Sequence, residues 1–312
     1  MRLSHHCFYY QRSVIVKIPI TLTVVFLICL LCLLYFSPAS KFQKAVEGEK
    51  LKLLNNPHEM QEEKMSMVGK EQYDHELISF VRKSLLVTPA PLSSPYNLNE
   101  PQILSQSKHQ LEEKVARVLK NKTRGFFIEC GALDGETRSN TLWLERSLGW
   151  QGLLVEADPL NFQMVQKKGR KAWLAPTCLS TERRPIMVSF DQNFNTGKID
   201  KLAQNFKDTK IEKPVIFCTP ITTLMLALNI SKVDYFSLDI EGSEFEVLRT
   251  IDFEKFEIST LTVEHQHLNQ SGKADMKKYM EDRGYQIVEP NYWDMPNRAD
   301  FVFAKTSLLY KN

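Results

Sequence analysis

Residues 125–136 read GFFIECGALDGE, and this stretch contains the pattern that decides the fold. An apolar run reaches Glu129 and then enters a turn of small residues that carries Asp134 and Glu136. From this point on, short apolar runs alternate with amphipathic helical segments. The alternation predicts an α/β fold with a largely parallel sheet that is covered by helices on both faces.

The composition is that of a globular protein, apart from one apolar segment near the start. The 312 residues carry 40 basic and 37 acidic side chains, and a net charge of +3 does not favour a nucleic-acid partner. Residues 18–36 contain no charge and are long enough to cross a bilayer. The alternative is a cleaved signal peptide, since residues 37–39 resemble a cleavage site, although the apolar part of a signal peptide is usually shorter.

The sequence predicts a type II membrane protein of the endoplasmic reticulum or Golgi, with its globular part in the lumen. Three glycosylation sequons on the long side of the apolar segment favour this orientation: Asn121, Asn229 and Asn269. The predicted segments are a cytosolic tail (1–17), a transmembrane signal-anchor (18–36), a lumenal stem (37–100) and a globular domain (101–312). Within the stem, only residues 75–86 have the pattern of a short amphipathic helix.

Three cysteines lie in the predicted globular domain, and an oxidising lumen would allow two of them to pair. Cys130 is embedded in an apolar strand, whereas Cys178 and Cys218 lie at the edges of predicted elements. We therefore favour a disulfide between Cys178 and Cys218. Three reduced, buried thiols are the alternative.

Carboxylates gather where predicted strands end, which is where open α/β sheets bind ligands. The turn at residues 131–135 has fewer glycines than a pyrophosphate-binding turn and carries a negative charge, so a nucleotide phosphate is disfavoured. S-adenosylmethionine fits better, because it has a sulfonium and an ammonium group but no phosphate. Glu156 follows the glycine turn at the spacing of a ribose-binding acid.

The candidate cofactor-binding residues combine small residues with these acids. Gly131 and Ala132 would let the backbone approach the cofactor, and Glu129 and Asp134 could face its amino-acid end. The full predicted set is Glu129, Gly131, Ala132, Asp134, Gly135, Glu156, Ala157, Asp239 and Glu241. The alternative is that these acids are merely exposed, as acids at strand ends commonly are.

Transfer of a methyl group to a hydroxyl requires a group that takes up the hydroxyl proton. Asp239, Glu264 and His265 are the candidate catalytic residues, since they follow two predicted strands. Alternatively, residues 264–267 are only a polar strand end. Asp239, Glu241 and His265 could hold a divalent ion, but they lack a tight ligand spacing, so no metal site is predicted.

Several motifs, in order, resemble one known family. They are ECGALDGE, SNTLWLER, GWQGLLVEADP, Cys178-Leu179-Ser180 and VDYFSLDIEGSEFEVL. Between residues 94 and 304 the chain resembles the FkbM-type methyltransferase domain. The particular residues of its SNTLWLE and LDIEGSE motifs resemble the animal membrane-anchored, Star-like branch of that family.

The resemblance implies a class I, Rossmann-like methyltransferase fold with a mostly parallel seven-stranded sheet. It also implies S-adenosylmethionine as cofactor and O-methylation of a hydroxyl or carboxyl group on a glycan, lipid or protein. Star-like proteins are associated with transport of epidermal growth factor receptor ligand precursors from the endoplasmic reticulum to the Golgi. A cargo-binding role with no or vestigial catalysis is therefore the implied alternative, with a membrane-bound growth-factor precursor as cargo.

Overall fold

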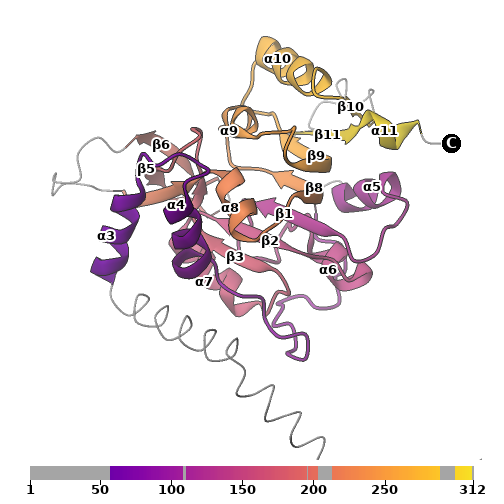
Figure 1. Ribbon diagram of the computed structural model, residues 1–312. Helices are drawn as coiled ribbons and strands as arrows, with labels where there is room; N and C mark the ends of the chain where they lie inside the picture. The colour runs from indigo at the N-terminus through magenta and orange to yellow at the C-terminus, as the bar shows by residue number, and fades with distance from the viewer. Residues whose placement is uncertain (1–56, 108–109, 195, 203–212, 289–298, 311–312) are drawn as a thin grey trace, which may run out of the picture. The chain divides into compact units, whose positions relative to one another are not determined.

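The computed structural model describes residues 57–107, 110–194, 196–202, 213–288 and 299–310 (Figure 1). The predicted tail, the apolar segment 18–36 and the first part of the predicted stem lie outside the described residues. Among the helices of the described residues, none is both long enough and apolar enough to span a membrane.

Seven strands form the central sheet, in the order β10-β11-β9-β8-β1-β2-β3. Their bounds are β1 (Phe126–Cys130), β2 (Gln151–Glu156), β3 (Trp173–Pro176), β8 (Lys232–Leu238), β9 (Glu257–Glu264), β10 (Tyr285–Ile287) and β11 (Asp300–Lys305). The five strands from β9 to β3 pair in parallel, and β11 is antiparallel to both of its neighbours. The sheet is therefore mixed, with the predicted parallel part at its centre.

Helices cover both faces of this sheet, because consecutive strand residues face opposite sides. In β1, Ile128 belongs to a core cluster that includes α4, α8, α9 and α10, whereas Phe127 belongs to a second cluster with α5, α6 and α7. The helices are α3 (Pro57–Met67), α4 (His75–Phe80), the π-helical turn η1 (Val81–Leu85), α5 (Leu111–Val118), α6 (Leu142–Leu148), α7 (Pro159–Lys167), α8 (Ile221–Ala227), α9 (Glu244–Thr250), α10 (Gln270–Glu281) and α11 (Thr306–Leu309).

A second, four-stranded sheet has the order β4-β7-β5-β6. It consists of β4 (Cys178–Leu179), β5 (Ile186–Asp191), β6 (Lys198–Leu202) and β7 (Val215–Thr219). Cys178 and Cys218 lie opposite each other in β4 and β7 and form a disulfide, which is the pair favoured by the sequence. Cys130 is a free, buried thiol in β1.

The globular unit begins at Pro57, well before the boundary expected at residue 101. The side chain of Leu77 in α4 is fully buried, and the ring of Phe80 packs edge-on against Phe217, with ring centroids 5.8 Å apart. Polar and proline-rich flanks made this segment look like part of a stem. Its few apolar residues nevertheless belong to the main hydrophobic core.

The packing of α4 predicts that Leu77→Ala destabilises the whole globular unit. Removing this fully buried side chain should lower the free energy of unfolding by about 2–5 kcal/mol. Leu92→Ala is the control, because Leu92 is 84% exposed and also lies in the predicted stem. Urea unfolding of both variants measures the difference; equal, small effects would show that α4 is not part of the core.

Candidate cofactor and acceptor site

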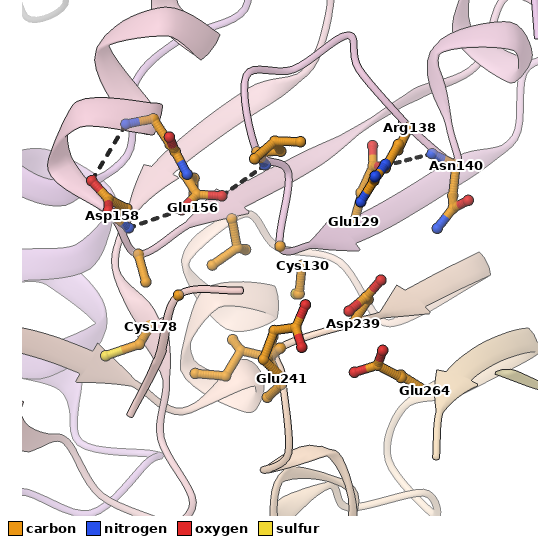
Figure 2. A pocket seen from close by; sticks show the side chains of 18 of the residues that line it. Glu129, Cys130, Arg138, Asn140, Glu156, Asp158, Cys178, Asp239, Glu241 and Glu264 are labelled. Atoms are coloured by element: carbon orange, nitrogen blue, oxygen red, sulfur yellow. Dashed lines mark hydrogen bonds between the residues drawn. The ribbon is translucent and has the colours of Figure 1, made fainter. Parts of the chain in front are cut away.

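A cavity of about 240 Å³ lies at the carboxyl ends of β1, β2, β8 and β9 (Figure 2). The chain leaves β1 towards β2 on one side, and β8 is the neighbour of β1 on the other side, so the strand order reverses here. Ligands bind at such switch points in open α/β sheets. The position of the cavity therefore follows from the topology of the sheet.

Gly131 forms the first turn after β1 and lies tightly between β2 and β8. Its N–H donates to the carbonyl oxygen of Val155, and the N–H of Asp239 donates to the carbonyl of Cys130. The φ angle of Gly131 is +79°, and an added Cβ would overlap the carbonyl oxygen of Asp239. Only glycine combines this backbone conformation with this close approach.

Glu129 anchors the loop that follows this turn. Its carboxylate accepts hydrogen bonds from Ser139 Oγ at 2.9 Å, from the backbone N–H of Asn140 at 2.6 Å and from Thr141 Oγ1. Burial raises the pKa of Glu129, while Arg170 and these hydrogen bonds oppose the shift. Glu129 also contributes to the cavity wall, but its described hydrogen bonds all come from its own loop.

Three of the predicted cofactor-binding residues lie away from the described cavity wall. Asp134 accepts hydrogen bonds from the backbone N–H of Thr137 at 2.7 Å and from its hydroxyl at 2.9 Å, and Lys168 Nζ lies 3.7 Å away. Ala132 is part of the core on one face of the sheet. Gly135 faces α7, where an added Cβ would lie 3.3 Å from Val165.

Glu156 ends β2 and lines the cavity together with Ala157. Its Oε2 accepts from the N–H of Leu133 at 2.7 Å, and its Oε1 accepts from the N–H of Asp158 at 2.8 Å. Burial raises the pKa of Glu156 to about 7, and the charge of Asp158 adds to this shift. Each oxygen can accept a further hydrogen bond, so the carboxylate is a rigid acceptor for two ligand hydroxyls.

A second group of acids lines the cavity at the ends of β8 and β9. Asp239, Glu241 and Glu264 contribute to the wall, and Figure 2 shows their side chains converging. Burial and the neighbouring carboxylates raise the pKa of Glu264, with Asp239 as the largest charge effect, followed by Glu241. The structure thus brings these three predicted site residues together.

His265 does not line the described cavity wall, which argues against its predicted catalytic role. Its ring packs against Phe301 with centroids 4.0 Å apart, and burial lowers its pKa to about 4. Consecutive residues at a strand end point in opposite directions, so Glu264 and His265 cannot both face the same cavity. The histidine near the acids is His267, whose Nε2 lies 3.0 Å from Glu241 Oε2.

Several residues of the cavity wall were not predicted from the sequence. The hairpin formed by β5 and β6 supplies Phe190, Phe194, Gly197 and Ile199, and the loop after β1 supplies Arg138 and Asn140. No strand-end pattern marks this hairpin. Asp300 was missed because it begins β11; as β11 is antiparallel, Asp300 pairs with Glu264 at the same edge.

Residues 129–287 match the sequence profile of the methyltransferase FkbM domain, which is half of the chain. The chain belongs to the FkbM methyltransferase family. S-adenosylmethionine, the cofactor expected from the sequence, is accordingly the cofactor of this domain. No curated protein sequence matches the chain significantly.

Solved structures of other methyltransferases are similar to the chain at low identity. Precorrin-6Y C5,15-methyltransferase from Geobacter metallireducens is 9% identical over 67% of this chain and 91% of its own, with a TM-score of 0.32. The METTL16 methyltransferase domain is 14% identical over 82% of this chain and 92% of its own, with a TM-score of 0.35. M. capricolum TrmK with S-adenosyl-homocysteine is 9% identical over 64% of this chain and 67% of its own, with a TM-score of 0.32. None of the three assigns an acceptor to this chain.

The close approach at Gly131 predicts a large effect of Gly131→Ala. Gly149→Ala is the matched control, because Gly149 also has a positive φ, of +66°, but has open space where a Cβ would lie. We expect a loss of about 1 kcal/mol at Gly149 from backbone strain alone, and of about 3 kcal/mol or more at Gly131. Urea unfolding compares the two variants; equal losses would mean that the contact with Asp239 does not constrain the loop.

Proposed function

We propose that this chain transfers the methyl group of S-adenosylmethionine to a hydroxyl or carboxyl oxygen of a glycan, lipid or protein. The observation that carries the proposal is the cavity at the strand-order reversal, with a glycine turn on one side and the fixed carboxylate of Glu156 on the other. Membership of the FkbM family supports the reaction type.

The residues of this cavity fit a cationic nucleoside. Gly131 allows the turn after β1 to pass directly against the carbonyl of Asp239, and Glu156 presents two oxygens that are already aligned by backbone N–H groups. Glu129, Ala157 and Asp239 complete this side of the wall. The bound cofactor supplies an electrophilic methyl group, and its loss leaves a neutral thioether.

The other end of the cavity would receive the acceptor oxygen. Asp239 and Glu264 are the predicted catalytic residues that line it. The pKa of Glu264 is raised by burial and neighbouring carboxylates, so the carboxylate of Asp239 is the candidate that could take the proton of an acceptor hydroxyl. Enclosure by the second sheet aligns the acceptor and limits access of water, which favours an in-line displacement. A carboxyl acceptor would need the alignment but no base at neutral pH.

Titration of the purified full-length chain with S-adenosylmethionine tests this function. Ribose hydroxyls favour the ionised form of Glu156, whose pKa is raised to about 7 in the free protein. Binding therefore strengthens as pH rises through 7, and the Kd at pH 6 should be about tenfold higher than at pH 8. Isothermal titration calorimetry measures both values.

Two variants sharpen this titration. Glu156→Gln should weaken binding and remove most of the pH dependence, whereas Glu246→Gln, an exposed acid on α9, should behave as the wild type. If the wild-type chain shows neither heat of binding nor thermal stabilisation by the cofactor, the methyltransferase proposal fails.

We also propose that the chain is a single-pass type II membrane protein of the endoplasmic reticulum or Golgi. The support is the uncharged segment 18–36, together with the positions of the three sequons. Asn121, Asn229 and Asn269 are all exposed in the structure, so each is accessible to a glycosyltransferase.

Glycosidase treatment checks this orientation. The full-length chain expressed in animal cells should shift to higher mobility on a gel after removal of N-glycans. A variant with all three sequon asparagines changed to Gln should run at the position of the treated protein. An unchanged wild-type band would place the globular unit outside the lumen.

The Star-like role in the transport of growth-factor precursors is the second candidate function. The predicted membrane anchor and the particular residues of the FkbM motifs favour this role. It requires a surface that holds a cargo ectodomain and does not require methyl transfer. Cofactor binding without release of S-adenosylhomocysteine in the presence of any acceptor would favour this candidate.

A further inference from the structure

Two carboxylates of the cavity wall, Glu241 and Glu264, lie close to an imidazole that lines the neighbouring pocket. Glu241 follows β8, Glu264 ends β9, and His267 lies three residues further along. One ligand atom from each residue lies within 4.8 Å of the other two. Metal–ligand distances of about 2.0–2.6 Å keep ligands of one ion at such separations, so a cation fits between them with little movement.

Glu264 has an oxygen that the described residues leave without a hydrogen bond. The residue is only 4% exposed; its Oε1 accepts from Gln266 Nε2, while Oε2 has no hydrogen-bond donor among the described residues. His267 Nε2 lies 3.4 Å from this oxygen. Buried carboxylate oxygens are normally satisfied, so an open one that lines a cavity indicates a ligand.

Basic side chains do not neutralise this pair of acids. In the part of the chain that the structure describes, neither Glu241 nor Glu264 forms a salt bridge with a Lys or Arg. The neighbouring Glu244 is already used locally, since its carboxylate accepts from the N–H groups of Ile240 and Gly242. The open oxygen therefore belongs to an acidic pair that lacks a strong positive partner.

We propose that Glu241, Glu264 and His267 bind a divalent cation of the Mg²⁺ or Mn²⁺ type. Carboxylate oxygens suit both ions, and the imidazole nitrogen favours Mn²⁺. His267, and not the predicted His265, is the histidine of this site, because its Nε2 lies 3.0 Å from Glu241 Oε2. It lines a neighbouring pocket that shares Glu241 and Gln266 with the cavity. Asp239 lies beside the site, within reach of Glu264.

Such a cation would occupy the acceptor end of the cavity. Three protein ligands leave coordination positions for water or for an acceptor oxygen, while Glu156 belongs to the wall supplied by β2. The bound cation would thereby orient a hydroxyl or carboxyl acceptor. This role rests on the proposed methyl transfer, whereas cation binding itself does not.

Electron paramagnetic resonance of Mn²⁺ tests the site. The full-length chain, freed of metal with a chelator and then dialysed, is titrated with MnCl₂ in a mild detergent. Binding removes the sharp signal of free Mn²⁺, and we expect one bound ion per chain that excess Mg²⁺ displaces. Persistence of the full free signal at millimolar Mn²⁺ would overturn the proposal.

Substitutions locate the bound ion. Glu264→Gln and His267→Ala should each raise the Kd for Mn²⁺ by about tenfold or more. Glu246→Gln, on the exposed side of α9, should leave it unchanged. The side chain of His267 is 37% exposed, so its variant tests the site even if Glu264→Gln does not fold. Wild-type affinity in His267→Ala would place the ion elsewhere and overturn the assignment.

The same protein separates this inference from the proposed function. S-adenosylmethionine is titrated once with a chelator present and once with Mn²⁺. Cofactor binding without Mn²⁺ binding would overturn only the cation site. Mn²⁺ binding without cofactor binding would overturn only the proposed methyl transfer.

Discussion

The buried carboxylate of Glu129 holds the loop on which the cavity depends. Three donors from residues 139–141 fix that carboxylate, and the loop is thereby folded back over the end of β1. Gly131 can then pass against the carbonyl of Asp239, which brings the ends of β1 and β8 together. The acids of the opening sequence stretch therefore serve mainly to hold the loop. Glu129 and Asp134 accept hydrogen bonds from its N–H and hydroxyl groups, and of these two acids only Glu129 also contributes to the cavity wall.

The sequence was sufficient to predict the central strands, the edge that carries the site and the acid that ends β2. These features depend on hydrophobic periodicity and on the rule that parallel strands end at one edge, and both act over short stretches of chain. Side-chain direction was harder to predict. Asp134 has the right position for a ligand, but an Asp two or three residues before free N–H groups bonds to its own turn. For His265, the alternation of side chains at a strand end decides against the cavity.

Other features depend on contacts between segments that are far apart in sequence. Helix α4 looks like an isolated stem helix until Phe80 packs against Phe217, and no local pattern reveals that contact. Part of the wall comes from β6 and the turn before it, a polar insert that pairs with β5, while β5 in turn pairs with the more distant β7. Asp300 reaches the acidic end only because β11 runs antiparallel to β9. Each case requires the direction or the partner of a strand, which composition and spacing do not contain.

The two ends of the cavity differ in how their charge is balanced. At the β2 end, backbone N–H groups occupy one position on each oxygen of Glu156, so a neutral ribose is sufficient to complete its hydrogen bonds. At the β8 and β9 end, burial and then the neighbouring carboxylates raise the pKa of Glu264, which means that the folded protein disfavours full ionisation there. Hydroxyl groups alone would not relieve that repulsion, whereas a positive charge would. The sulfonium of S-adenosylmethionine carries one positive charge, but it is covalently bonded to the ribose, so its position follows that of the ribose. The proposed cation, held by Glu241, Glu264 and His267, would supply a positive charge next to these carboxylates.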